Sequence, residues 1–241
     1  MRRFFFLLAL PLAAQPELPV AWVRTSVEYA ALSEQAYRGA AQALEAALAQ
    51  PQWTAALEQK PGFAGLPPAV ILDLDETVLD NSEHQAALAA QRIAFDNEKW
   101  NAWVAQAKAT AVPGAIEFLK FAQMRGVALV YVTNRTCKAD DENDPTVRNL
   151  RRLGAPWSPA RLLCRTGSGS DKSARRAAVA ESYRVLLLVG DDFQDFVSVP
   201  AEQNSIAGRR EILAPHRQFF GQRWFLLPNP MYGSWERVLQ R

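Results

Sequence analysis

Four acidic side chains follow directly on an apolar run in the first third of the chain. In the segment VILDLDETVLDNS (70–82), Asp73 and Asp75 come after three strongly apolar residues, and Glu76 and Asp80 come shortly after them. Desolvating this much like charge is costly unless a cation or a reaction uses it. Two or three carboxylates can hold a hard cation such as Mg²⁺, which prefers oxygen ligands. One carboxylate can also act as a nucleophile that accepts a phosphoryl group.

Other apolar runs also lead into residues that could take part in such chemistry. The pairs are VALVYV (127–132) before Thr133, RLLC (161–164) before the loop that ends at Lys172, and VLLLV (185–189) before Gly190 and Asp191. Open α/β sheets bind their ligands at the carboxyl ends of the strands. We therefore expect Thr133, Lys172 and Asp191 to converge with the first two aspartates on one crevice.

The elements that must position these residues alternate along the chain. A further apolar run is WFLL (224–227), and the helical segments between the runs are 114–124, 143–153 and 171–182. Apolar runs that alternate with helices indicate a parallel sheet covered on both faces. Apolar residues in 24–50 recur at spacings of three and four, which predicts one long helix closed by Pro51. The expected fold is α/β, with a Rossmann-like parallel sheet and helices on both faces.

The first fifteen residues, MRRFFFLLALPLAAQ, are typical of a secretory signal. The apolar part is too short to span a bilayer, and no cysteine follows it to carry a lipid anchor. Of 27 basic residues the signal holds two, so a protein of residues 16–241 would carry 25 basic against 25 acidic residues. This balance gives no support to binding of a nucleic-acid polymer. We expect an exported protein, periplasmic or secreted, with no transmembrane segment after signal removal. The sequence does not decide whether it forms an oligomer.

Four short segments resemble the motifs of the haloacid dehalogenase (HAD) superfamily: DLDET (73–77), VTNR (132–135), Lys172 and GDDFQDF (190–196). Closer similarity is to the class C acid phosphatases, a group that includes the bacterial outer-membrane lipoprotein 5′-nucleotidases. It rests on LDLDETVLDNS, FDNEKWNAWV (95–104), AVPGAIEF (111–118) and LLPNPMYGSWE (226–236). The resemblance runs from about residue 20 to the C-terminus and implies a single HAD-like phosphatase domain over 16–241.

The resemblance also implies a mechanism. Asp73 would be the nucleophile, and Asp75 the general acid and then the base that hydrolyses the phospho-enzyme. Mg²⁺ would be held by Asp73, the Asp75 carbonyl and Asp191. The implied activity is that of a Mg²⁺-dependent acid phosphatase acting on small phosphomonoesters, nucleoside 5′-monophosphates in particular. A phosphotransferase that uses the same intermediate and a non-catalytic binding or storage relative are the alternatives.

Further residues take supporting roles in this scheme. Thr133 and Lys172 would bind phosphate, Asn134 would contact the substrate, and Asp195 would support the metal ligands. Residues 80–110 would form a small helical cap after the first strand. Phe95 and Tyr232 would stack on the nucleobase. Stacking of this kind tolerates any base, because each base has a π-face. The alternative is that Phe95 and its neighbours Trp100 and Trp103 form the core of the cap.

The remaining polar residues are expected to have other roles. His84 and His216 are expected at the surface, and His84 is also a candidate for the site entrance. Arg175 and Arg176 are expected on a solvated helix face, and 140–144 in a solvated loop. Glu76 is expected at the site rim, and Asp80 is expected to form hydrogen bonds at the cap junction. An exported protein could pair its two cysteines, Cys137 and Cys164. The sequence leaves this open because the separation of their Cα atoms cannot be inferred from it.

Overall fold

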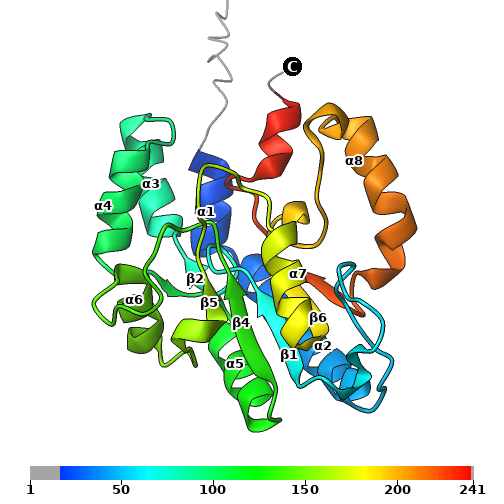
Figure 1. The fold of residues 1–241 in the computed structure, drawn as a ribbon. Coiled ribbons are helices and arrows are strands. Elements are labelled where there is room, and N and C mark those ends of the chain that lie inside the picture. Colours follow the sequence, from blue (N-terminus) through cyan, green and yellow to red (C-terminus); the bar gives the residue numbers. More distant parts are fainter. Residues whose placement is uncertain (1–16, 240–241) are drawn as a thin grey trace, which may run out of the picture.

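The computed structural model describes residues 17–239, in which a five-stranded parallel sheet forms the centre (Figure 1). Its strands lie in the order β5-β4-β1-β6-β7. They are β1 (Pro68–Leu72), β4 (Ala128–Val132), β5 (Leu162–Leu163), β6 (Arg184–Gly190) and β7 (Trp224–Leu226). In the ladder, Leu72 pairs with Tyr131 of β4 and with Val189 of β6, so these three strands end at nearly the same level.

Helices cover both faces of the sheet, as predicted. Successive side chains of a strand point to opposite faces, so Val70 and Leu72 pack with the core of α2 (Val27–Leu48) and α5 (Ala115–Met124). Ala69 and Ile71 instead face α7 (Ser173–Ser182). In Figure 1, α7 lies in front of the sheet and α2 behind it. The remaining sheet-side helix is α6 (Pro145–Leu153), which follows β4.

The long helix predicted over 24–50 is present as α2, and a shorter helix that was not predicted precedes it. Ser26 separates α1 (Glu17–Thr25) from α2, and its hydroxyl accepts a hydrogen bond from the Tyr29 amide at 3.1 Å, as an N-cap residue does. The apolar spacing continues across this break, so periodicity alone did not reveal it. The predicted signal, 1–15, lies outside the described residues. Within 17–239, no helix is both long and apolar enough to cross a membrane.

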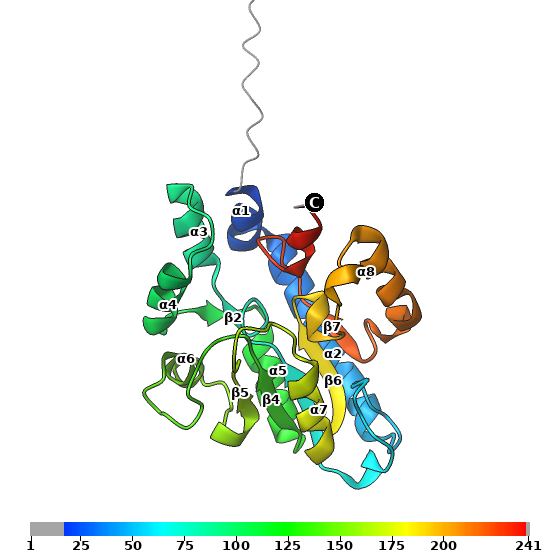
Figure 2. The same ribbon diagram turned by 45° about the horizontal axis from the view of Figure 1, so that its top comes forward.

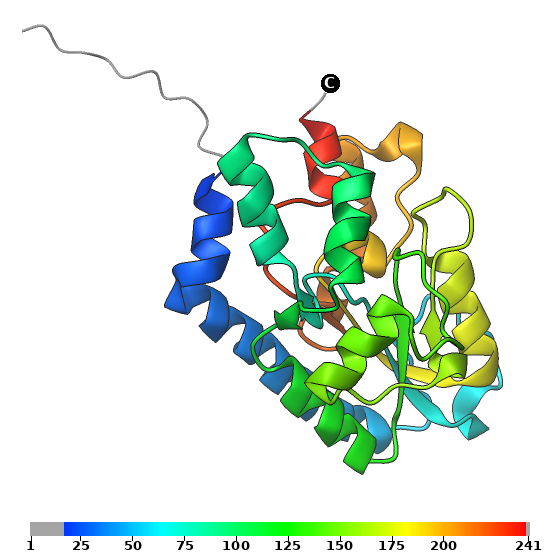
Figure 3. The ribbon, with the colours of Figure 1, turned by 90° about the vertical axis from the view of Figure 1, so that its left-hand side faces the viewer.

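Between β1 and β4 the chain leaves the sheet to form the segment predicted as a cap. The strands β2 (Leu79–Asp80) and β3 (Thr110–Ala111) pair antiparallel and frame the helices α3 (Ser82–Gln91) and α4 (Asn97–Ala105). Figure 2 shows this cap on one side and the C-terminal segment on the other, both above the strand ends. In Figure 3, α1 lies beside α3 and so supports the cap from outside.

Another α-helix that was not predicted is α8 (Ile206–Leu213), between β6 and β7. Short 3₁₀ turns complete the chain at Phe63–Gly65, Pro159–Arg161, Phe193–Asp195, Ala201–Gln203, Ala214–Phe219 and Ser234–Val238.

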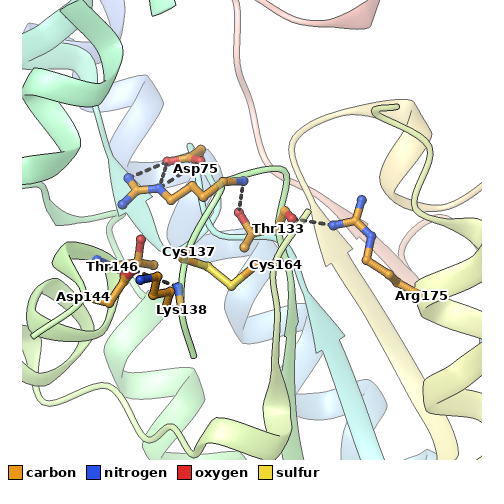
Figure 4. The surroundings of a disulfide bond; sticks show 9 residues. Asp75, Thr133, Cys137, Lys138, Asp144, Thr146, Cys164 and Arg175 are labelled. Atoms are coloured by element: carbon orange, nitrogen blue, oxygen red, sulfur yellow. Dashed lines mark hydrogen bonds and ion pairs between the residues drawn. A yellow bond between two sulfur atoms is a disulfide. The ribbon is translucent and has the colours of Figure 1, made fainter. Parts of the chain in front are cut away.

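The two cysteines form a disulfide, which the sequence left open. Cys137 lies in the loop after β4 and Cys164 directly after β5, and their Cα atoms are 5.5 Å apart. Figure 4 shows the bond beside Thr133, the residue that follows β4. The disulfide thus ties the loop after β4 to the short edge strand.

Candidate active site

A pocket of about 570 Å³ opens at the carboxyl ends of the strands. The lining includes eight of the nine residues that the sequence assigned to the site: Asp73, Asp75, Phe95, Asn134, Lys172, Asp191, Asp195 and Tyr232. The ninth, Thr133, is fully buried behind them. The predicted convergence is therefore present, while the individual roles of these residues stay predictions.

Asp73, Lys172 and Asp195 form a buried ionic cluster at the base of the pocket. Asp73 follows β1, and its amide donates to the Val189 carbonyl of β6 at 3.0 Å. The Lys172 ammonium contacts Asp73 Oδ1 and lies 2.6 Å from Asp195 Oδ1. Burial raises the pKa of Asp73 to about 7, although Lys172 acts in the opposite direction. Burial lowers the pKa of Lys172, but the two carboxylates outweigh it and raise that pKa.

Asp73, Asp191 and Asp195 form a carboxylate cluster that could hold a cation. Ligand oxygens of Asp73, Asp191 and Asp195 all lie within 4.8 Å of one another. Asp191 follows β6 and accepts hydrogen bonds from Thr77 Oγ1 at 3.2 Å and Asn229 Nδ2 at 2.8 Å. Burial, with the charges of Asp195 and Asp73, raises the pKa of Asp191 well above its usual value. An all-oxygen set of three carboxylates fits a hard divalent cation, and the Lys172 ammonium offsets part of their charge.

Asp75 is held by a residue to which the sequence assigned no role. The Arg135 guanidinium donates to Asp75 Oδ1 from Nε at 2.9 Å and from Nη2 at 2.7 Å. Asn81 Nδ2 donates to the same oxygen at 2.9 Å. Arg135 is only 3% exposed. Its position in VTNR, at the end of a strand, was the one signal in the sequence that could have identified it.

The prediction that Glu76 lies at the site rim is wrong. Its side chain is 2% exposed, and it accepts hydrogen bonds from the Asn81 amide at 2.8 Å, from Asn81 Nδ2 at 3.2 Å and from the Tyr232 hydroxyl. Glu76 has a φ of 57°, which is uncommon outside glycine and turns the side chain back under the cap junction. Burial, with the charges of Asp75 and Asp191, raises its pKa well above the usual value. Glu76 therefore joins the cap junction to the C-terminal segment.

The loop after β4 is fixed by a network of hydrogen bonds. Thr133 Oγ1 accepts from the Arg135 amide at 3.1 Å, and Asn134 Nδ2 donates to the Ser170 carbonyl at 3.0 Å. Arg175 donates to the Thr133 carbonyl, as Figure 4 shows, and to Asn134 Oδ1 at 2.6 Å. Arg175 is thus not on a solvated helix face as predicted, because it braces the loop that carries the predicted phosphate ligands.

Arg176 contradicts the same prediction more strongly. Its side chain is 1% exposed, with an ion pair to Glu58 at 2.7 Å. Its Nη1 also donates to the carbonyls of Gln194 at 3.2 Å and Asp195 at 3.1 Å. Residue spacing on α7 could not show this, since the groups that cover Arg176 come from distant parts of the chain.

Three further expectations concern polar residues near the cap and the loop after β4. His84 is not at the surface: it is buried, stacked 5.9 Å from Trp103, and burial lowers its pKa. Asp144, in the loop predicted to be solvated, is buried and accepts from the Thr146 amide at 2.8 Å as N-cap of α6. Asp80 does hydrogen-bond at the cap junction, where it accepts from the Ser82 amide at 2.8 Å.

Aromatic side chains form the outer wall of the pocket. Phe95 is 62% exposed, and its ring lies 6.4 Å from that of Trp100, which also lines the pocket. Trp103 is buried in the core, as the alternative interpretation of the cap aromatics proposed, whereas Phe95 is not. His216, expected at the surface, is partly buried, with its ring 5.3 Å from that of Trp224.

Comparison with known proteins agrees with this geometry. The family model described as HAD superfamily, subfamily IIIB (acid phosphatase), matches residues 11–235. The class C acid phosphatase from Bacillus anthracis is 34% identical, with a TM-score of 0.81 over 94% of this chain and 88% of that one. The same protein with tungstate bound gives a TM-score of 0.80 over the same shares, again at 34% identity.

A curated relative, acid phosphatase 1 from Solanum lycopersicum, is 26% identical over 174 residues, which are 67% of this chain. The chain spans 57% of the length of that relative. The family match covers most of the chain and includes every strand of the sheet. The chain therefore belongs to subfamily IIIB of the HAD superfamily, the acid phosphatases.

Proposed function

We propose that the protein is an exported, Mg²⁺-dependent acid phosphatase that hydrolyses phosphomonoesters through an aspartyl-phosphate on Asp73. The observation that carries this proposal is the contact of Asp73 with Lys172 at the base of a pocket that also contains the carboxylate cluster. The relatives named class C acid phosphatases support the reaction type. Tungstate is a tetrahedral oxyanion like phosphate, so its binding by the Bacillus anthracis protein supports recognition of a phosphoryl group.

In the first half of the reaction, an Asp73 carboxylate oxygen attacks phosphorus and the bond from phosphorus to the leaving oxygen breaks. Asp75 gives its proton to that oxygen, so the product leaves as an alcohol. Lys172 offsets negative charge near the phosphoryl oxygens. Asp73, Asp191 and the Asp75 carbonyl, with Asp195 beside them, would hold a divalent cation, whose charge would offset that of the carboxylates and the phosphoryl oxygens.

In the second half, Asp75 takes a proton from water while the water oxygen attacks phosphorus. The bond between phosphorus and the Asp73 oxygen breaks, which releases inorganic phosphate and restores both aspartates to their starting states. Because Asp75 must begin with a proton, we expect a rate optimum on the acid side of neutrality. An optimum above about pH 8 would contradict this role of Asp75.

The pocket supports nucleoside 5′-monophosphates as substrates. Phe95 from the cap and Tyr232 from the C-terminal segment both line it, and Phe95 leaves much of its ring uncovered. Aromatic rings on which a base can stack tolerate any base. A volume of about 570 Å³ falls in the usual range for small-molecule sites.

Phosphate release from a panel of nucleoside monophosphates, sugar phosphates and p-nitrophenyl phosphate, with Mg²⁺ and with a chelator, tests the proposal. We expect Asp73→Asn to abolish Mg²⁺-dependent turnover while the melting temperature changes little. The exposed Asp140→Asn serves as a matched control and should behave like the unmodified protein. Near-normal turnover by Asp73→Asn would refute nucleophilic catalysis by this residue, and no release from any substrate would favour a binding protein.

The same assay with added glycerol separates hydrolysis from phosphotransfer. A hydrolase yields inorganic phosphate alone, whereas a phosphotransferase yields glycerol phosphate in proportion to the alcohol. Export is tested separately by N-terminal sequencing of the protein from the culture medium and from a periplasmic extract. An intact N-terminus in the cytoplasmic fraction alone would contradict it.

A further inference from the structure

Arg135 is a buried cation that the reaction scheme above does not use. The only carboxylate it pairs with among residues 17–239 is Asp75. Its guanidinium carbon lies 5.4 Å from the centre of the Trp100 ring of the cap. The backbone around it is fixed too. The Arg165 amide donates to the Arg135 carbonyl at 2.9 Å, and Cys137, two residues after Arg135, forms the disulfide with Cys164. A cation held this firmly cannot move away from Asp75 without disturbing the loop.

The two oxygens of Asp75 are in unequal surroundings. Oδ1 accepts three hydrogen bonds, two from Arg135 and one from Asn81, at 2.7–2.9 Å. Oδ2 accepts one longer hydrogen bond, at 3.1 Å from Arg135 Nε. A carboxylate oxygen has about two lone-pair sites, so Oδ1 has no capacity left for a proton. Asp75 lines the pocket, and Oδ2 is the oxygen with a free site.

We propose that Arg135 and Asn81 are positioning residues that orient the Asp75 carboxyl group so that Oδ2 exchanges the proton with the leaving oxygen and with water. This inference rests on the proposed function, because it assumes that Asp75 is the acid and base. Arg135 and Asn81 themselves transfer no proton. They remove the rotational freedom of the carboxyl group and leave one oxygen available.

Asn81 connects this arrangement to the cap. Trp103 Nε1 donates to Asn81 Oδ1 at 2.8 Å, and Arg135 Nη2 donates to the same atom at 3.2 Å. An indole N–H can only donate, so it fixes Oδ1 on that side and turns Nδ2 toward Asp75. The side-chain amide is fully buried. Helix α4 therefore sets the orientation of the acid through a single side chain.

Two classes of substrate separate positioning of a proton donor from a general structural role. p-Nitrophenolate leaves readily without a proton, whereas the alkoxide of glycerol phosphate needs one. We expect Arg135→Gln to lower kcat/KM for glycerol phosphate by roughly 100-fold, which is typical of lost general acid catalysis, and for p-nitrophenyl phosphate by less than about fivefold. Arg135→Lys, which keeps the charge but has no fork of donors, should recover only part of the loss.

A double-mutant cycle provides the second readout. If Arg135 acts through Asp75, then Asp75→Asn combined with Arg135→Gln should be no slower on glycerol phosphate than Asp75→Asn alone. Arg152→Gln is the matched control, because Arg152 donates to the Ala107 carbonyl at 3.0 Å at the base of the cap, away from the pocket. It should change the two substrates equally and little.

The outcomes separate the positioning role of Arg135 from the role of Asp75 as the general acid. Equal losses on both substrates for Arg135→Gln, or additive losses in the double variant, would overturn the positioning role. If Asp75→Asn itself shows no preference for the better leaving group, the assignment of Asp75 as the acid fails instead. Melting temperatures are measured for every variant, and if Arg135→Gln does not fold, Arg135→Lys and Asn81→Ala carry the same comparison.

Discussion

Protons should compete with the divalent cation for the carboxylate cluster, so lowering the pH should weaken cation binding. Asp73 must lose its proton to act as a ligand. Its burial raises the pKa to about 7 in the metal-free protein, and the pKa of Asp191 is raised as well. A raised carboxyl pKa means that the folded protein holds the proton more tightly than the unfolded chain. Without metal, the free energy of unfolding therefore falls as the pH rises from about 4 to about 7.

The size of the effect follows from the pKa of Asp73. With a value of about 7, roughly three quarters of Asp73 is ionised at pH 7.5 and about 3% at pH 5.5. The apparent dissociation constant for Mg²⁺ should then rise about 25-fold between these two pH values, which corresponds to about 1.9 kcal/mol. Competition at Asp191 would increase this further.

Isothermal titration calorimetry of the chelator-treated protein with MgCl₂ at both pH values measures the change directly. Asp73→Asn is the informative control, since an amide oxygen binds a cation without first losing a proton. Its affinity should be weaker but should change much less with pH. If the dissociation constant of the unmodified protein differs by less than about threefold between the two pH values, competition between protons and the cation is refuted. Protonation of Asp73 alone predicts a larger change in affinity.

Three further predictions concern packing around the site. Cys137→Ser with Cys164→Ser should lower the free energy of unfolding by about 3.5 kcal/mol, from the entropy of a loop with a sequence separation of 27, in urea titrations without reductant. A change below about 1 kcal/mol would contradict the loop-entropy argument. Arg176→Met should cost about 3 kcal/mol in the same titration because the partly buried Glu58 carboxylate and two backbone carbonyls lose their buried donor, and an unchanged midpoint would count against this. Gly190→Ala places a Cβ 2.5 Å from the Cβ of Asp195, so steady-state kinetics should show kcat reduced by about tenfold or more, and unchanged kcat would mean that Asp195 can shift freely.

The sequence was informative where function depends on strand ends. Asp73, Thr133 and Asp191 each follow a continuous apolar run, and runs of that kind become parallel neighbours whose ends coincide. The crevice could therefore be predicted before any contact was known. Lys172 was predictable for a similar reason, as it opens the helix that follows the next strand.

The residues that sequence reasoning missed owe their positions to contacts between distant segments. Arg176 is buried because Glu58 and the turn after β6 cover it. Glu76 is buried because its backbone takes a left-handed conformation, which pattern analysis does not foresee for glutamate. Arg135 was within a recognised motif, yet its partner Asp75 lies 60 residues earlier in the chain. Periodicity describes which face of an element is apolar, and it carries no information on which charged groups meet across the fold.

The short strands at the two edges of the sheet have a consequence for solubility. The edge strands β5 and β7 are two and three residues long, so a neighbouring molecule finds little exposed backbone on which to add a strand. The strand just inside β5 is different, because β4 reads ALVYV and is buried throughout. Five residues rich in β-branched and aromatic side chains are typical of segments that aggregate when uncovered. By holding β5 at the edge, the disulfide keeps the end of β4 covered and so protects the protein from association between sheets.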